Sequence, residues 1–128
     1  MESIKLDLII ERGEDGLWGR VTYNDSLIVD SGKSVAELQE KLKKLLFEFE
    51  GLSPESLEFE HFYDVYALFV QFDYLNITKV AKRAGINPGL LRQYASQVKH
   101  PSATQAKKLE NTIHQLADEL KEAMVYAE

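Results

Sequence analysis

The 128-residue chain contains no cysteine. A disulfide framework, a thiolate metal site and a cysteine nucleophile are therefore excluded. The chain also lacks any apolar run that approaches the roughly 20 residues needed to cross a bilayer. At the amino terminus, Lys5, Asp7 and Glu11 interrupt the apolar residues, so we expect no secretory signal there. These absences predict a soluble cytoplasmic protein.

A further absence concerns acidic side chains. From Asn76 to Leu109 there is no Asp or Glu, although the chain has a formal net charge of -6. Residues 1–63 carry 7 basic and 14 acidic side chains, whereas residues 64–128 carry 8 and 7. This asymmetry indicates two tasks, one of which involves a polyanion. The basic residues of the acid-free segment are Lys79, Lys82, Arg83, Arg92, Lys99, Lys107 and Lys108.

Alternating apolar residues predict three strands at the start of the chain. In residues 4–11 one face is apolar, and residues 17–23 continue the alternation after a turn that contains Gly13 and Gly16. A short third strand over residues 26–30 completes an antiparallel meander.

A helix is predicted after the meander. Ser34 and Glu37 form a capping-box pattern, and apolar residues then recur every three or four positions. This apolar stripe is expected to pack on the apolar face of the meander. Gly51 ends the helix, and residues 57–62 alternate as a fourth strand. Residues 1–63 are thus predicted to form a small antiparallel βββαβ domain, and the whole chain belongs to the α+β class.

The second half of the chain, residues 64–128, is predicted to be helical. Residues 64–73 are apolar on most sides, as in a helix buried between two layers. Asn76 is placed to cap a helix that Gly85 ends, and the dipeptide at 87–88 is Asn-Pro, which is typical of a helix start.

Residues 77–96 fit the spacing of a helix-turn-helix. The motif requires a small residue where its helices cross and a residue that tolerates positive φ in the turn. Ala81 and Gly85 occupy these two positions. The inward-facing positions are also apolar: Val80, Ala84, Ile86, Leu91 and Tyr94. The joint match predicts an all-α, repressor-like DNA-binding domain over residues 64–128; a helical hairpin that only packs or binds protein is the alternative.

The second helix of this motif, from Pro88 to about Ser96, is predicted to enter the major groove. Arg92 is suited to a bidentate contact with guanine and Gln93 to one with adenine. Lysine side chains beside them would contact phosphates. Carboxylates would then be absent because each would face a phosphate at close range. The predicted DNA-binding residues are Lys79, Lys82, Arg83, Asn87, Gly89, Arg92, Gln93, Ser96 and Lys99.

The element order, with the segment INPGLLRQYASQVKHPSATQAKKLENTIHQLADEL, resembles the HicB antitoxins of bacterial type II toxin-antitoxin systems, in particular those with a repressor-like helix-turn-helix. The resemblance covers nearly the full chain and is most specific from Leu75 to Leu120. It implies that the first domain is a partial, catalytically inert RNase H-like fold that binds the HicA toxin, a small ribonuclease, and that the second domain represses the operon.

Two positions depart from the HicB pattern. The proline-rich stretch that many members carry after the second strand is replaced by residues 23–27, YNDSL. The usual glycine after the recognition helix is replaced by Gln97, so that helix is expected to end differently or to run on slightly.

A partner surface is predicted on the first domain. Trp18 lies on the hairpin face opposite Leu17 and Val21, beside Arg20, where it either anchors a partner or is covered by the inter-domain helix. The acidic residues Glu55, Glu58 and Glu60 would steer a basic toxin surface.

No catalytic residue, metal site or cofactor is predicted. Asp7, Glu11 and Asp30 are scattered over strands, whereas two-metal chemistry needs acids that converge on one site. The three histidines, His61, His100 and His114, have no ligand spacing. We therefore do not expect an enzyme.

The last helix is predicted to run from about Ala103 to Val125 and to support a homodimer or a higher homo-oligomer. Its apolar stripe either completes the core of its own domain or pairs with a second copy, which would set two recognition helices about one DNA turn apart. The stripe residues are Leu109, Ile113, Leu116, Leu120 and Met124.

These features predict an antitoxin-like transcriptional regulator with operator DNA and a HicA-like toxin as its partners. The alternative from another class is a protein-interaction module whose helical half serves only for assembly.

Overall fold

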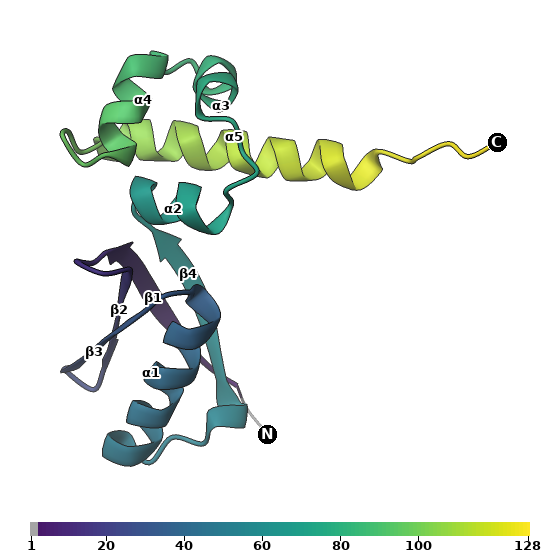
Figure 1. Ribbon diagram of the computed structural model, residues 1–128. Helices are drawn as coiled ribbons and strands as arrows, with labels where there is room; N and C mark the ends of the chain where they lie inside the picture. The colour runs from purple at the N-terminus through teal and green to yellow at the C-terminus, as the bar shows by residue number, and fades with distance from the viewer. Residues whose placement is uncertain (1–2) are drawn as a thin grey trace. The chain divides into compact units, whose positions relative to one another are not determined.

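The computed structural model describes residues 3–128 (Figure 1). The chain divides into two compact units, Met1–Phe72 and Asp73–Glu128. The first contains a four-stranded sheet with helices and the second contains helices, so the α+β class is confirmed. The sequence predicts a division after residue 63, whereas the chain divides after Phe72. The reason is that helix α2 (Val65–Gln71) packs on the sheet, with Ala67 fully buried in the core of the first unit.

The sheet of the first unit has the strand order β3-β2-β1-β4. Its first three strands pair in antiparallel fashion as predicted, but β4 pairs in parallel with β1, with Leu57 opposite Ile4. The prediction of a wholly antiparallel domain was therefore wrong. A helix precedes β4, and a helical crossover returns the chain to the end from which β1 also starts. The strands are β1 (Ile4–Arg12), β2 (Leu17–Tyr23), β3 (Ser26–Gly32) and β4 (Leu57–Tyr63).

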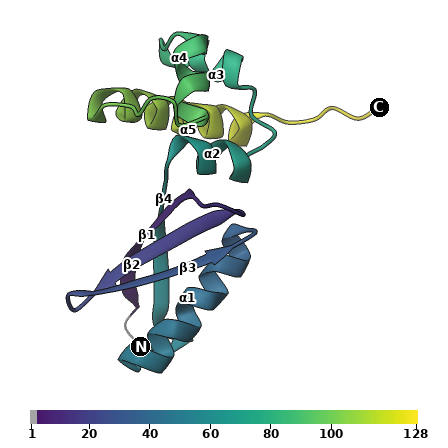
Figure 2. The same cartoon turned by 60° about the vertical axis from the view of Figure 1, so that its left-hand side comes forward.

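Helix α1 (Val35–Glu50) packs against one face of this sheet, as the apolar stripe predicted (Figures 1 and 2). It begins at Ser34, whose Oγ accepts a hydrogen bond from the backbone N–H of Glu37 at 3.1 Å. A Cβ atom at Gly19 would lie 2.3 Å from Cδ2 of Leu38, so the glycine leaves room for this fully buried leucine. The short 3-10 helix η1 (Pro54–Ser56) then leads into β4.

The second unit is built on α3 (Ile77–Ala84), α4 (Pro88–Ala95) and α5 (Ala103–Glu122). Each begins at the predicted cap, because the side chains of Asn76, Asn87 and Ser102 accept hydrogen bonds from backbone N–H groups of the first turn. Helix α5 ends at Glu122, three residues before the predicted end at Val125. The core of this unit consists of Val80, Ala81, Ile86, Leu91, Tyr94 and Leu109, with Thr112 beside them.

Between residues 3 and 128, no helix has both the length and the apolar character that crossing a membrane requires.

Candidate nucleic-acid interface

The turn between α3 and α4 fixes the geometry of this candidate interface. Gly85 has φ 72°, and the backbone N–H of Ile86 donates to the carbonyl of Ala81 at 2.9 Å. No atom lies within 4 Å of a Cβ built at Gly85, so the glycine is needed for its backbone conformation and not for space. Ala81 is fully buried, and α3 contacts α4. The positive φ of Gly85 and the burial of Ala81 agree with the spacing of these two residues.

Helix α4 has a buried side and an exposed polar side. Leu91 is fully buried and Tyr94 is 7% exposed, which anchors the helix in the unit. Arg92, Gln93 and Ser96 are exposed. These three side chains are therefore accessible to a ligand; Arg92 and Gln93 lie on α4, and Ser96 caps its end.

Two of the other predicted contact residues also shape the start of α4. Asn87 Oδ1 accepts hydrogen bonds from the backbone N–H groups of Gly89, at 2.8 Å, and Leu90, at 3.2 Å. Its oxygen is therefore committed to the helix cap, although the side chain is exposed. Gly89 is half-buried, and a Cβ there would lie 3.1 Å from Asn87 Oδ1. Both residues therefore shape the first turn of α4, in addition to any contact that they make with a ligand.

The guanidinium group of Arg92 is already held by a neighbour. Its Nη1 donates a hydrogen bond to Oγ1 of Thr78, in the first turn of α3, at 3.0 Å. The two residues are 14 positions apart in the chain. Sequence reasoning missed Thr78, because neither its residue type nor its spacing from Arg92 indicates that the two side chains meet.

The basic side chains around α4 differ in their surroundings. Lys79, Lys82 and Lys99 are exposed. Arg83 Nη2 forms an ion pair with Oε2 of Glu119 on α5 at 2.5 Å, and both side chains are about half exposed. An exposed ion pair of this kind adds little stability, but the carboxylate partly neutralises the positive charge of Arg83. Glu119 lies ten residues beyond Leu109, the end of the acid-free segment, and was also missed.

Helix α4 ends with Gln97 in the left-handed conformation, at φ 65°. The backbone N–H of Val98 donates to the carbonyl of Gln93 at 3.0 Å, and the N–H of Gln97 donates to that of Tyr94 at 3.2 Å. These two bonds form a Schellman motif, in which the left-handed position is most often glycine. The helix therefore stops at Ala95 and does not run on.

Helix α5 contains four of the five residues predicted for dimerisation. Leu109 is 5% exposed, so it belongs to the core of its own unit and is removed from any surface that a second copy could contact. Ile113 and Leu116 are half-buried. Leu120 is exposed, and Met124 lies beyond the end of the helix. The accessible part of the stripe is therefore shorter than predicted.

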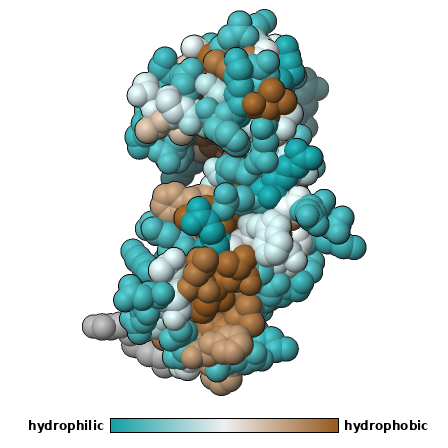
Figure 3. All heavy atoms as spheres, turned by 90° about the vertical axis from the view of Figure 1, so that its left-hand side faces the viewer, coloured by the Kyte–Doolittle hydropathy of each residue, from teal (hydrophilic) through white to brown (hydrophobic). Residues whose placement is uncertain are grey.

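The face of the sheet opposite α1 carries exposed apolar side chains. In the view of Figure 3, a patch of apolar atoms is exposed in the lower part of the picture. Trp18 is 43% exposed, while Leu17 and Val21 on the other face are buried. This arrangement agrees with the predicted orientation of Trp18. The other large exposed residues on this face, by strand register, are Leu27, Val29 and Phe62.

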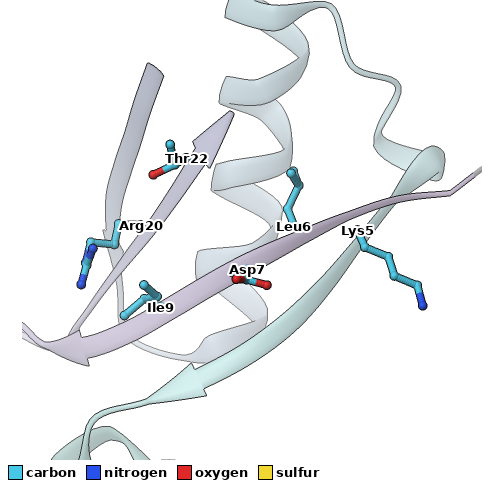
Figure 4. A pocket seen from close by; sticks show the side chains of 6 residues that line it. All are labelled: Lys5, Leu6, Asp7, Ile9, Arg20 and Thr22. Atoms are coloured by element: carbon cyan, nitrogen blue, oxygen red, sulfur yellow. The ribbon is translucent and has the colours of Figure 1, made fainter. Parts of the chain in front are cut away.

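Charged residues surround these apolar side chains. Arg20 Nε pairs with Glu11 Oε1 at 2.7 Å, and Val29 lies opposite Arg20 on β3. A shallow hollow of about 330 Å³ lies between β1 and β2 (Figure 4), where Leu6 points toward the helix side while Lys5 extends away from the other lining residues. The lining residues are Lys5, Leu6, Asp7, Ile9, Arg20 and Thr22.

The predicted acidic partner residues lie on and next to the edge strand β4. Glu58 and Glu60 are exposed and lie opposite Lys5 and Asp7 of β1. Glu55 precedes the strand, and a hydrogen bond from the Ser53 hydroxyl to its carboxylate holds the pKa of Glu55 below its usual value. All three carboxylate side chains are exposed to solvent.

The scattered carboxylates of the sheet do not converge. Strand alternation puts Asp7 and Glu11 on the open face, whereas Asp30 shares the face of Val21 and Ile28. Among residues 3–128, no group of three His, Cys, Asp or Glu side chains is arranged to hold a metal ion. His61 contacts Gln39 on α1, and partial burial lowers the pKa of its imidazole.

Comparison with known proteins gave no match to a family model, to a curated protein or to a solved structure.

Proposed function

We propose that this protein is a transcriptional regulator that binds operator DNA through a helix-turn-helix formed by α3 and α4. The observation that carries the proposal is the exposed edge of α4. Arg92, Gln93 and Ser96 lie on it, within a segment that has no acidic residue from Asn76 to Leu109. Arginine and glutamine on a rigid helix are the side chains that read guanine and adenine in the major groove.

The cations near α4 support the same proposal. Lys79, Lys82 and Lys99 are exposed, and lysines at the sides of a recognition helix bind phosphates and fix its register. The unit Asp73–Glu128 carries 8 basic and 6 acidic side chains, whereas Met1–Phe72 carries 7 and 15. The acidity of the chain thus resides in the other unit. Encounter with DNA depends on the local potential of the docking surface and not on the net charge of the chain.

The test begins with selection of binding sites from a pool of random DNA duplexes by the full-length chain. Arg92→Ala should cost about 1–3 kcal/mol on the selected duplex and relax the preference for one base pair. Lys79→Ala should weaken binding to selected and random duplexes alike, and reduce the slope of log K against log salt by about one. If both variants have the same effect on selected and random DNA, Arg92 does not read a base.

A homodimer is part of this proposal. Two-fold pairing through the accessible part of the α5 stripe, from Ile113 to Leu120, would place two copies of α4 about one DNA turn apart. The selected site should then be an inverted repeat with half-sites about 10 base pairs apart. A selected site without this symmetry, together with a monomer in sedimentation equilibrium at micromolar concentration, would argue against the dimer.

A second function is proposed for the first unit, namely neutralisation of a HicA-type toxin ribonuclease. The observation that favours it is the open sheet face, where Trp18 and Leu27 are exposed within an acidic unit. A small basic partner would gain both apolar burial and charge complementarity there. Cytoplasmic location follows for a regulator of this kind.

The toxin proposal is tested with the product of the adjacent reading frame, which the proposal expects to be a small basic protein. Trp18→Ala should weaken the complex by about 2 kcal/mol or more in calorimetry, as removal of a central aromatic anchor does. Phe49→Ala is the control, because Phe49 is a similarly large aromatic residue, 72% exposed, on α1 of the same unit. Complex formation without any selected DNA site would instead identify a protein-interaction module.

A further inference from the structure

The hydrogen bond between Thr78 and Arg92 links the two helices at the side chain that we assign to base reading. The acceptor is Oγ1 of Thr78, the second residue of α3, and the donor is Nη1 of Arg92, in the middle of α4, at 3.0 Å. Threonine is β-branched and has few favoured χ1 rotamers in a helix, and in the one observed its hydroxyl accepts from Arg92. The bond therefore restricts a side chain that is otherwise exposed and long.

The contact with Thr78 uses Nη1 and leaves the Nε and Nη2 edge of the guanidinium open to a ligand. Arginine has five N–H donors in a planar fork, and one of those on Nη1 is directed at Thr78. The edge formed by Nε and Nη2 still has two parallel donors. Guanine offers two acceptors, O6 and N7, at the spacing that such an edge matches.

We propose that Thr78 is a positioning residue for base recognition: it holds the Arg92 guanidinium so that the Nε and Nη2 edge faces a guanine. This inference rests on the proposed function, which it deepens by naming the base and the device that orders its reader. The gain in specific affinity comes from preorganisation of the Arg92 side chain. Part of the rotamer freedom that arginine would lose on binding is already lost in the free protein.

A purely structural role for the bond would have a different signature. If the bond only joined α3 to α4, its loss would lower the stability of the unit and would weaken every DNA sequence equally. If it orders Arg92, its loss lowers the ratio of affinity for the selected duplex to affinity for random duplex. The ratio is therefore the informative measurement, with the melting temperature measured alongside it.

The experiment compares full-length variants on the duplex selected by the wild type and on a scrambled duplex of equal length. Thr78→Val removes the hydroxyl but keeps the branched shape, and Thr78→Ser keeps the hydroxyl. Thr104→Val is the matched control, because Thr104 is exposed and is likewise the second residue of a helix, α5. Thr78→Ala removes the hydroxyl in a second way, in case the valine variant melts early.

Thr78→Val and Thr78→Ala should each lower the specificity ratio roughly threefold to tenfold, the effect of releasing one immobilised side chain. Thr78→Ser and Thr104→Val should preserve it. In an Arg92→Ala background, Thr78→Val should change nothing further, because the side chain that it orders is gone. Replacing one guanine of the selected duplex by 7-deazaguanine, which lacks the N7 acceptor, should weaken the wild type roughly tenfold and leave Arg92→Ala unaffected.

Three results would overturn the inference. One is an unchanged ratio in Thr78→Val and Thr78→Ala while Arg92→Ala lowers it. Another is an equal loss on selected and scrambled duplexes, and the third is a full effect of Thr78→Val in the Arg92→Ala background. Failure of the proposed function is distinct, since the wild type would then select no sequence from the pool.

Discussion

The two units of the chain differ in net charge and in how their cores are built. The first has a net charge of -8 and builds its core where α1 meets a four-stranded sheet, whereas the second has +2 and builds its core from helices alone. The net charge of the chain, -6, describes neither unit. The charge of each unit, and not that of the whole chain, therefore indicates the kind of partner that the unit can bind.

The largest expected effect comes from a substitution that unfolds the first unit and leaves the second folded. Leu38 is fully buried between α1 and the sheet, so Leu38→Ala should cost about 2–5 kcal/mol, most or all of the stability of so small a unit. Trp18, the single tryptophan of the chain, reports this unfolding by its fluorescence in urea. Binding to the selected DNA should persist. Phe49→Ala, at an exposed site on the same helix, should change the midpoint little.

The converse change disrupts the second unit. Ala81 is fully buried on α3, which contacts both α4 and α5, and Ala81→Leu would overpack this core at a cost of about 1–3 kcal/mol. Far-UV circular dichroism should show part of the helical signal melting earlier, while the Trp18 transition stays in place. Ala106→Leu, on the exposed side of α5, is the control. A joint shift of both transitions would show that the units unfold as one.

The smallest expected effect is a gain in the stability of the second unit. Gln97 has φ 65°, a conformation that costs a residue with a Cβ about 1 kcal/mol or more. Gln97→Gly relieves this strain but adds freedom to the unfolded chain, so the net gain should be about 0.5 kcal/mol. Gln115→Gly, in the middle of α5, should instead destabilise by about 0.5–1 kcal/mol. Equal losses in both variants would contradict the strain at Gln97.

Local patterns predicted most of the secondary structure of this chain. Side chains that satisfy the first backbone amides, as Asn76 and Ser102 do, mark helix starts in the sequence. Alternation likewise predicted which side of each strand is buried. Alternation does not state the direction of the neighbouring strand, which is why the parallel pairing of β4 with β1 was missed.

The sequence predicted the exposure of single residues in the candidate site, but not the contacts between pairs of side chains. The exposure of Arg92 and Gln93 follows from their helical spacing relative to Leu91 and Tyr94. The contacts that hold the arginines, Thr78 with Arg92 and Glu119 with Arg83, join residues 14 and 36 positions apart. Such pairs depend on how the helices cross, and no local signal encodes them.

The parallel pairing of β4 with β1 has a consequence for how the chain folds. Ile4 meets Leu57, so the ladder closes a loop of some 50 residues, whereas the contacts between α3 and α4 span only short stretches of chain. Closing a long loop costs entropy before its contacts are gained, and such topologies fold slowly. During synthesis the sheet remains incomplete, with one side of β1 unpaired, until the residues of β4 leave the ribosome. The unit made first is therefore the slower of the two to form, and until then an exposed strand edge is open to association with other chains.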